Sequence, residues 1–354
     1  MSRFRSFALF STLVSSPPHS LRSRAGCGRA VLGGLAALGL MALTGCAAIQ
    51  VHLGMKVYLA KTPVTSIEAT QPNGPGIVPG GKSPLMVTVT EPTGKTLATE
   101  GAGHGKVMWR DLAVTAMVVS VDKKGIVTLP HDARKSDGKL PHISITVPSH
   151  PDVQAELDIP LRYDFPFVSN FSGASGSDGS NGQDGSDGTA GGPGSNDPDN
   201  PSPGGNGGNG SDGGNGGDGG NGGDAPAVQV TVTLRGGTHP LLQAHVAAAG
   251  HNRYYLVDPK GGTLTVMADG GSGGSGGKGG RGGRGGSGGS GSPDGSSGSD
   301  GSDGHDGMDG SAGRPGSITV TYDPAVQPYL TLIHLSSQGG PKPAFQQQAV
   351  APLW

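Results

Sequence analysis

Residues 76–83 read Gly-Ile-Val-Pro-Gly-Gly-Lys-Ser and fit the phosphate-loop pattern G-x-x-x-x-G-K-S. In a nucleotide site this loop joins a buried strand to a helix, so that backbone N–H groups and the helix N-terminus face the phosphates. Residues 69–75 do not read as a buried strand, and Pro84 is followed at once by a β run. We therefore interpret the segment as a glycine-rich turn that enters a strand, and we expect no nucleotide binding.

Residues 270–274, Gly-Gly-Ser-Gly-Gly, fit the G-x-S-x-G pattern of serine esterases. That chemistry requires a buried strand, a turn and a helix around the serine, and a glycine repeat supplies no helix. The eleven histidines lack the i, i+4 or Cys-linked spacing that is typical of metal sites. We expect no catalytic residue, no metal site and no cofactor, and hence a protein that is not an enzyme.

The beginning of the chain is basic and then apolar. Residues 1–30 contain five arginines and no acidic residue, and an apolar run follows from Val31 to Leu43. A spanning helix needs about 20 apolar residues, so this run is too short to cross a bilayer comfortably. A basic start, a short apolar run and small residues before a cleavage point are typical of a secretory signal. The long basic region also allows translation to start downstream of Met1.

The sequence Leu43-Thr44-Gly45-Cys46 resembles the lipobox of bacterial lipoproteins. The resemblance implies cleavage before Cys46 and acylation of that cysteine, so residues 1–45 would be a signal peptide outside the mature fold. Cys27 would be removed, which leaves no free thiol for catalysis or metal binding. Because Ala47 and not Asp follows the cysteine, the resemblance implies the outer membrane. The alternative is an ordinary signal peptide with an incidental cysteine.

Residues 46–168 carry short strand patterns divided by Pro and Gly. The candidate strands are 85–90, 114–121, 142–147 and 153–159, several of which alternate apolar and polar residues. No segment has a helical period. We therefore predict a mostly β protein whose N-terminal domain is a sandwich similar to bacterial immunoglobulin-like domains. The formal net charge of −2 gives no reason to expect a nucleic-acid partner.

Four runs place Gly at every third residue, with eight, seven, eight and eight triplets. They are called run one (173–194), run two (204–222), run three (270–291) and run four (295–316). Runs two and three are mostly Gly-Gly-Xaa, and within the four runs Pro occurs only at 193 and 315. Residues 195–203 and 292–294 are rich in turn-forming residues, so we predict two hairpins, at 169–224 and 270–316.

The triplets resemble collagen, in which only Gly fits at the crowded edge of a three-residue extended helix. The scarcity of Pro and the equal run lengths favour a closer resemblance to the polyglycine-II bundles of some glycine-rich antifreeze and phage adhesin proteins. That resemblance implies four antiparallel helices in one chain, with runs two and three in the centre. A disordered linker and an intermolecular collagen-like trimer remain alternatives, and the oligomeric state is open. Weak Ca²⁺ binding to the Ser-Asp-Gly triplets is a further alternative.

Charge spacing predicts a register for the second hairpin. Folding the chain about 292–294 brings residues whose numbers add to 587 opposite each other. The resulting pairs, each of opposite sign, are Lys278–Asp309, Arg281–Asp306 and Arg284–Asp303. Exposed pairs of this kind contribute about 0–1 kcal/mol each but can select a register.

Residues 225–269 and 317–354 are expected to form one small β module. The candidate strands are 228–234, 241–247, 254–257, 263–267, 317–322 and 329–335, with a turn at 258–262. This module would hold the ends of both hairpins and fix their separation.

These features predict a surface-exposed structural or adhesive lipoprotein that is anchored in a lipid membrane. Its further partner would be a surface polysaccharide or a protein. The alternatives are a carbohydrate- or protein-binding module of the cell envelope and, less favoured, an envelope hydrolase.

Replacing the acylated residue tests the anchor. In Cys46→Ala we expect the exported protein to move from the membrane fraction to the soluble fraction, because each buried methylene of the lost lipid contributes about 0.8 kcal/mol. Fractionation followed by immunoblotting measures the shift, with Cys27→Ala as the control that stays in the membrane. Unchanged membrane association of Cys46→Ala would contradict the anchor.

Overall fold

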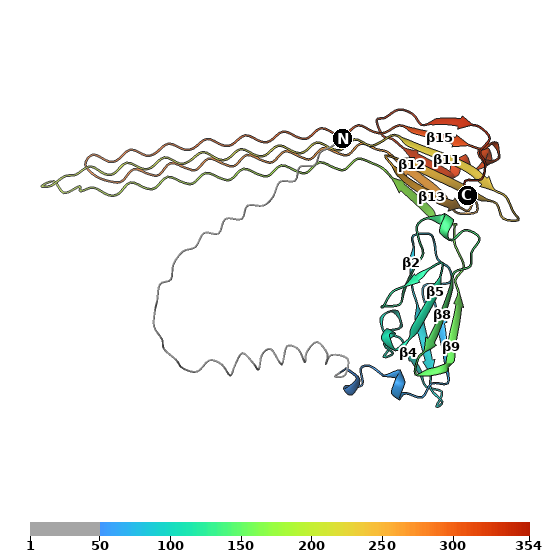
Figure 1. Cartoon of the computed structure of the whole chain (residues 1–354). Helices are drawn as coiled ribbons and strands as arrows, with labels where there is room; N and C mark the ends of the chain where they lie inside the picture. The colour runs from blue at the N-terminus through green and yellow to red at the C-terminus, as the bar shows by residue number, and fades with distance from the viewer. Residues whose placement is uncertain (1–49) are drawn as a thin grey trace, which may run out of the picture. The chain divides into compact units, whose positions relative to one another are not determined.

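Short strands make up most of the regular structure in residues 50–354, which are the residues that the computed structural model describes. The protein is therefore mostly β, as the alternating patterns predict (Figure 1). The proposed lipobox residues Leu43, Thr44, Gly45 and Cys46 lie outside the described residues, together with the rest of the expected signal segment.

The first nine strands form three antiparallel three-stranded sheets, in the orders β1-β3-β4, β5-β8-β9 and β2-β7-β6. Alternate residues are buried, as in β3, where Val87 and Val89 are fully buried between partly exposed neighbours. The strands are β1 Ser66–Thr70, β2 Lys82–Pro84, β3 Met86–Thr90, β4 Thr96–Ala98, β5 Ala113–Met117, β6 Ser120–Val121, β7 Ile126–Thr128, β8 His142–Val147 and β9 His150–Asp158. Four short 3₁₀ helices lie among them: η1 Leu59–Lys61, η2 Gly101–Gly103, η3 Trp109–Asp111 and η4 Ala133–Lys135.

Two details of this region bear on the sequence predictions. The single strand predicted over 114–121 is wrong, because Val118 has a φ of 71° and this left-handed backbone separates β5 from β6. In the phosphate-loop-like segment, Pro79 and Gly80 form a turn and β2 begins at Lys82. The interpretation of this segment as a turn that enters a strand is confirmed.

The remaining strands form a three-stranded parallel sheet, β10-β14-β16, and a five-stranded mixed sheet, β13-β12-β11-β15-β17. Both sheets contribute to one apolar core, which contains Leu264 and Val266 of β14 and Val230 and Val320 of the mixed sheet. The strands are β10 Pro166–Asn170, β11 Val228–Arg235, β12 Leu241–Ala248, β13 His251–Val257, β14 Thr263–Met267, β15 Ile318–Tyr322, β16 Ile333–Ser336 and β17 Ala344–Gln347.

Two predictions about this module need correction. Strand β10 crosses the expected boundary at 168 and pairs with β14. It therefore belongs with the second group of sheets, which are the parallel sheet and the mixed sheet, and not with the first group, which are the three sheets of β1 to β9. The strand predicted over 329–335 is wrong for its first half, because residues Pro324–Leu332 form the 3₁₀ helix η5. Asp323 caps η5 by accepting the N–H of Ala325, and Pro324 opens the helix with a preset φ. The predicted turn at 258–262 is present, because the N–H groups of Gly261 and Gly262 both donate to the carbonyl of Asp258.

The four glycine runs lie side by side as long extended segments (Figure 1). Their backbone hydrogen bonds recur every third residue, for example from Gly176, Gly179 and Gly182 of run one to the carbonyls of run three. Runs one and two are antiparallel, as are runs two and three and runs three and four. Runs two and three each bond to all three other runs, whereas runs one and four bond only to those two. Runs two and three are therefore central.

Backbone contact explains why glycine recurs. A Cβ at Gly182 of run one would overlap the carbonyl oxygen of Gly214, and one at Gly304 of run four would overlap the same oxygen from the other side. In run three both glycines of each triplet are needed, since a Cβ at Gly279 or Gly280 would overlap a carbonyl oxygen of run four or run one. Run three thus needs two glycines in each triplet, whereas the outer runs need one.

The sheets and the runs share one register. Strand β10 pairs with β14 at residues 97 apart and leads into run one, while β14 leads into run three. Between runs one and three, the side-chain hydrogen bonds also join residues 97 apart. Strands β11 and β15 pair at residues 90 apart, and the bonds between runs two and four keep that same separation. These two parallel strand pairs, β10–β14 and β11–β15, are therefore each continuous with a parallel pair of glycine runs.

Candidate functional site

A ladder of Asn and Asp side chains joins run two to run four. The Oδ1 atom of each accepts a backbone N–H from the residue 90 positions later, as when Met308 donates to Asp218 at 2.8 Å. The ladder contains Asn206, Asn209, Asp212, Asn215, Asp218, Asn221 and Asp224. Because short polar side chains readily bond to backbone groups, these residues satisfy N–H groups that the glycine contacts leave open.

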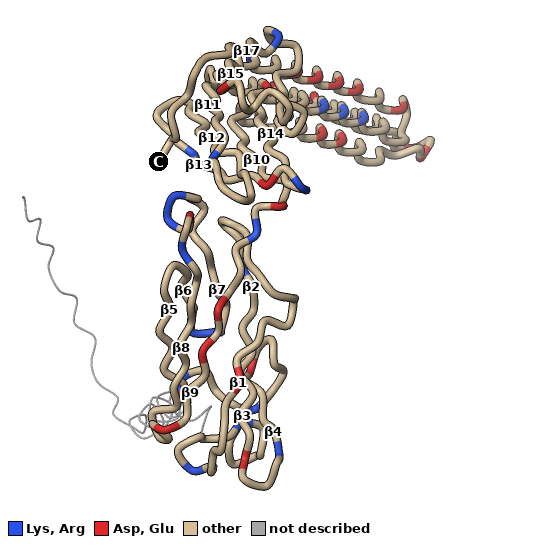
Figure 2. The backbone as a smooth tube through the Cα atoms, turned by 90° about the vertical axis from the view of Figure 1, so that its right-hand side faces the viewer, with Lys and Arg blue, Asp and Glu red and all other residues tan. Residues whose placement is uncertain are grey.

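Two similar ladders flank run three. From run one, Asp178, Asn181, Asp184 and Asp187 accept the N–H groups of Ser275, Lys278, Arg281 and Arg284. From run four, Asp300, Asp303, Asp306 and Asp309 accept those of Gly285, Gly282, Gly279 and Gly276. The cationic row of run three therefore lies between two largely acidic rows, and Figure 2 shows the blue row with red on both sides.

The predicted charge pairs differ from those observed. Lys278 pairs with Asp306 at 2.7 Å, whereas the predicted partner was Asp309. The carboxylates of Asp303, Asp306 and Asp309 each use Oδ1 to accept a glycine N–H of run three. The second hairpin is therefore shifted by three residues relative to the arrangement predicted from Lys278, Arg281 and Arg284, because Asp306 lies where Asp309 was predicted.

The Lys278–Asp306 pair shifts both pKa values in the direction that favours the charged forms. The hydrogen bond to Asp306 raises the pKa of the Lys278 ammonium. The same bond, followed by the N–H of Gly279, lowers the pKa of the Asp306 carboxyl. Both side chains are exposed, so the pair contributes little to the stability of the fold.

A cleft of about 800 Å³ lies where the first group of sheets meets the second. One wall consists of the 78–81 turn with His131 and Asp132, and the other consists of residues 165–168 and 252–255. Apolar atoms dominate the lining, which includes four aromatic rings: Phe165, Phe167, Tyr254 and Tyr255. Phe167 packs at 5.9 Å from Phe165 and at 5.8 Å from Tyr255, measured between ring centroids.

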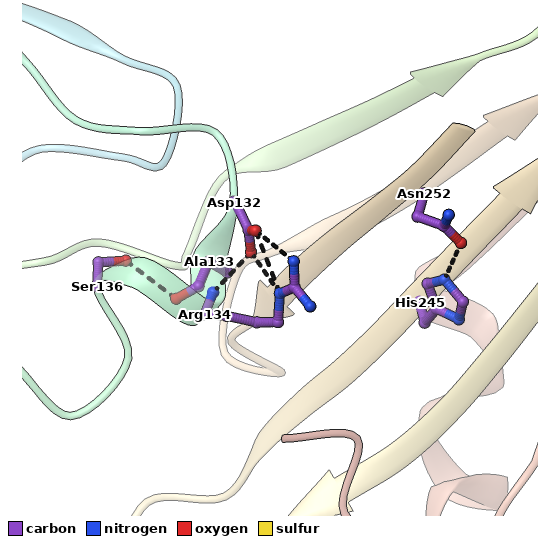
Figure 3. A network of polar contacts seen from close by, with 6 residues as sticks. All are labelled: Asp132, Ala133, Arg134, Ser136, His245 and Asn252. Carbon is purple, nitrogen blue, oxygen red and sulfur yellow. Dashed lines mark hydrogen bonds and ion pairs between the residues drawn. The ribbon is translucent and has the colours of Figure 1, made fainter. Parts of the chain in front are cut away.

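Stacked side chains fix the position of Tyr254 beside this cleft. The guanidinium of Arg134 lies 3.6 Å from the Tyr254 ring centroid, and the ring of His245 stacks parallel to it at 4.6 Å. Asp132 caps η4 by accepting the N–H of Arg134 and also holds the Arg134 guanidinium, at 2.7 Å to Nη2 (Figure 3). His245 Nε2 in turn bonds to Asn252 Oδ1 at 2.8 Å.

The last residues of the chain also tie the two groups of sheets together. Trp354 donates its Nε1–H to Asp137 Oδ2 at 2.9 Å, and its ring packs edge-on against Tyr254. Arg235 forms an ion pair with Asp137 at 3.0 Å. Beneath these contacts Ala133, Leu241 and Leu256 are buried as a small apolar cluster. These contacts hold Asp137 of the first group of sheets close to Arg235 and Tyr254 of the second group.

Other candidate chemistry is sparse in residues 50–354. No group of three or more His, Cys, Asp or Glu in this part of the chain is arranged to hold a metal ion. His142 lies between two carboxylates, with Nδ1 at 2.7 Å from Asp158 Oδ1 and Nε2 at 2.7 Å from Glu156 Oε2. These contacts raise the pKa of His142, and the hydrogen bond to Asp158 is the largest cause. No helix among these residues is both long and apolar enough to cross a bilayer.

Comparisons with family models, with curated proteins and with solved structures returned no match. The function proposed below therefore depends on the residues and contacts of this chain.

Sequence reasoning located the glycine contacts but missed the ladders and the cleft. The signal for the ladders was present, because Asn or Asp occupies the last position of every run-two triplet and both residues commonly bond to backbone N–H groups. The cleft had no local signal, since its lining comes from four separate segments.

Removing one rung tests the ladder. In Asp218→Ala the N–H of Met308 loses its acceptor, so its hydrogen exchange should accelerate about fivefold, as expected for a bond of about 1 kcal/mol. Asp218→Asn keeps the accepting oxygen and should exchange like the parent protein. NMR detects both rates. Equal exchange of Met308 in the parent and in Asp218→Ala would contradict the assigned role.

Proposed function

We propose that the mature chain is a membrane-anchored, surface-exposed structural and adhesive lipoprotein that presents a stiff glycine-rich rod. The observation that carries this proposal is the network of period-three hydrogen bonds among all four glycine runs. A rod of this kind can project a protein surface away from a membrane, whereas a flexible linker of the same length has no fixed reach.

The rod is best described as an antiparallel polyglycine-II bundle of two hairpins. Its support is the close approach of carbonyl oxygens to glycine Cα atoms at every third position. Each run of about 22 residues, at about 3.1 Å per residue, gives a length of about 65 Å. The first group of sheets fits an immunoglobulin-like sandwich, because its antiparallel strands bury alternate residues.

The anchor in this proposal is a lipid on Cys46, with the outer membrane as its location. The support is the lipobox-like sequence 43–46 after a basic and then apolar segment. Several acyl chains together hold a protein stably to a bilayer. The lipid membrane is thus one partner, and a surface polysaccharide or protein is the other.

The proposal assigns no catalysis. Residues 270–274 are extended and belong to run three, so they lack the helix that an esterase nucleophile requires. The phosphate-loop-like residues form a turn that leads to a strand and not to a helix.

The cleft favours a second candidate function, a binding module of the cell envelope. A concave, mostly apolar site with a few polar groups is the usual form of a ligand site, and the cleft has that form. This function is compatible with the rod, because the cleft and the glycine runs are built from different residues.

Surface display and adhesion can be tested on bacteria that express the chain. An epitope tag inserted in the 195–203 turn should be labelled by antibody on intact cells, and these cells should adhere in greater numbers than cells that carry an empty vector. The matched control replaces the segments 173–224 and 270–316 with Gly-Ser linkers of equal length, which should reduce adhesion. Labelling only after permeabilisation, or adhesion equal to that of the vector control, would contradict the proposal.

A further inference from the structure

We propose that the cleft between the 78–81 turn and strands β10 and β13 binds a neutral saccharide of two or three sugar units. This inference deepens the second candidate function, the binding module. It does not depend on the lipid anchor or on the glycine rod.

The aromatic lining provides the apolar surface that a sugar ring needs. Phe165 is 43% exposed although it is a large apolar residue, and its ring packs against the buried Phe167, which in turn contacts the half-buried Tyr255. The C–H face of a pyranose packs on such rings by dispersion and burial of apolar area. Water-exposed aromatic surface of this kind gives affinity without requiring a charged ligand.

Polar groups on both walls can orient the hydroxyls. His131 lies against Gly80, where any Cβ would overlap the imidazole, so the missing side chain at Gly80 makes room for this ring. Asn252 lines the cleft on the same wall as the aromatic rings. Its Oδ1 holds His245 (Figure 3), which leaves its amide nitrogen as a donor. An imidazole and an amide can both donate hydrogen bonds to sugar hydroxyls or accept them, depending on the group and tautomer.

Charge around the cleft favours a neutral ligand. Asp132 and Arg253 are the charged residues of the lining, and their formal charges cancel. Both are engaged, since Arg134 binds both oxygens of Asp132. Arg253 stacks on Phe171 and donates to Ser169 Oγ and the Asn170 carbonyl. The lining therefore carries no net formal charge and gathers no group of cations that would attract an anionic ligand.

Size and bracing fit the same class of ligand. The volume of about 800 Å³ lies in the range of sites that hold small molecules, and the half-open shape allows a chain to continue beyond the bound units. The Arg134–Tyr254–His245 stack and the Trp354 contacts hold the walls before a ligand arrives. Such preorganisation reduces the entropy lost on binding.

Titration calorimetry with the whole mature chain tests the inference. The probes are maltotriose, cellotriose, xylotriose, mannotriose and tri-N-acetylchitotriose, with trigalacturonic acid as the anionic comparison. We expect at least one neutral trisaccharide to bind. Phe165→Ala and His131→Ala should each weaken that binding about tenfold or more, while Phe345→Ala should bind like the parent, because Phe345 has a similar exposure (51%) on β17 outside the cleft.

A second variant separates loss of folding from loss of the site. In Gly80→Ala the added Cβ meets the His131 ring, so saccharide binding should fall. The circular dichroism spectrum of this variant should match that of the parent protein. The inference is overturned if no neutral trisaccharide binds to the folded parent protein, if only the anionic sugar binds, or if the cleft variants bind as the parent does. These outcomes leave the surface-display experiment unaffected, so the two proposals fail independently.

Discussion

Contact between backbones, made possible by the absence of a side chain at every third residue, is the constraint on which the rest of this molecule depends. Carbonyl oxygens of each run approach glycine Cα atoms of its neighbours so closely that a Cβ would overlap them. The same spacing lets glycine N–H groups donate to neighbouring carbonyls at about 2.8 Å along the length of the runs. A core of apolar side chains is therefore replaced, in this part of the chain, by hydrogen-bonded backbone.

Such a bundle must have its register specified, because a repeat of three residues can slip by three without changing its contacts. The sheets supply this specification. The 97-residue separation of β10 and β14 continues into runs one and three, and the 90-residue separation of β11 and β15 continues into runs two and four. Apolar residues such as Val230 and Val320 pack in a single core, so slippage of a run would disturb packing that is not periodic. The Asn and Asp side chains of the ladders then accept the backbone N–H groups that the contacts between glycines leave without an acceptor.

The sequence predicted much of this because its strongest signals are local and periodic. Gly-Gly-Xaa in runs two and three indicated two contact edges, and these runs are central. The strands around Val87 and Ile143 followed from alternation. The register of Lys278 could not be predicted from charge alone, since exposed pairs contribute little free energy and the paired strands of the sheets specify the register. The 3₁₀ helix at 324–332 was missed because apolar residues without regular alternation do not distinguish a short helix from a strand. The cleft was missed because it joins residues far apart in sequence, and only tertiary structure places Phe165 near His131.

The measurement that tests the central claim most directly is limited proteolysis of the mature protein with Gly279, Gly282 and Gly285 all replaced by Val. The matched control replaces Ser275, Ser287 and Ser290, exposed positions of the same run, by Val. We predict that the glycine variant becomes rapidly cleaved throughout 173–224 and 270–316, because each new side chain overlaps a carbonyl oxygen of run four, while the serine variant resists cleavage like the parent. Equal resistance of the two variants would contradict the account.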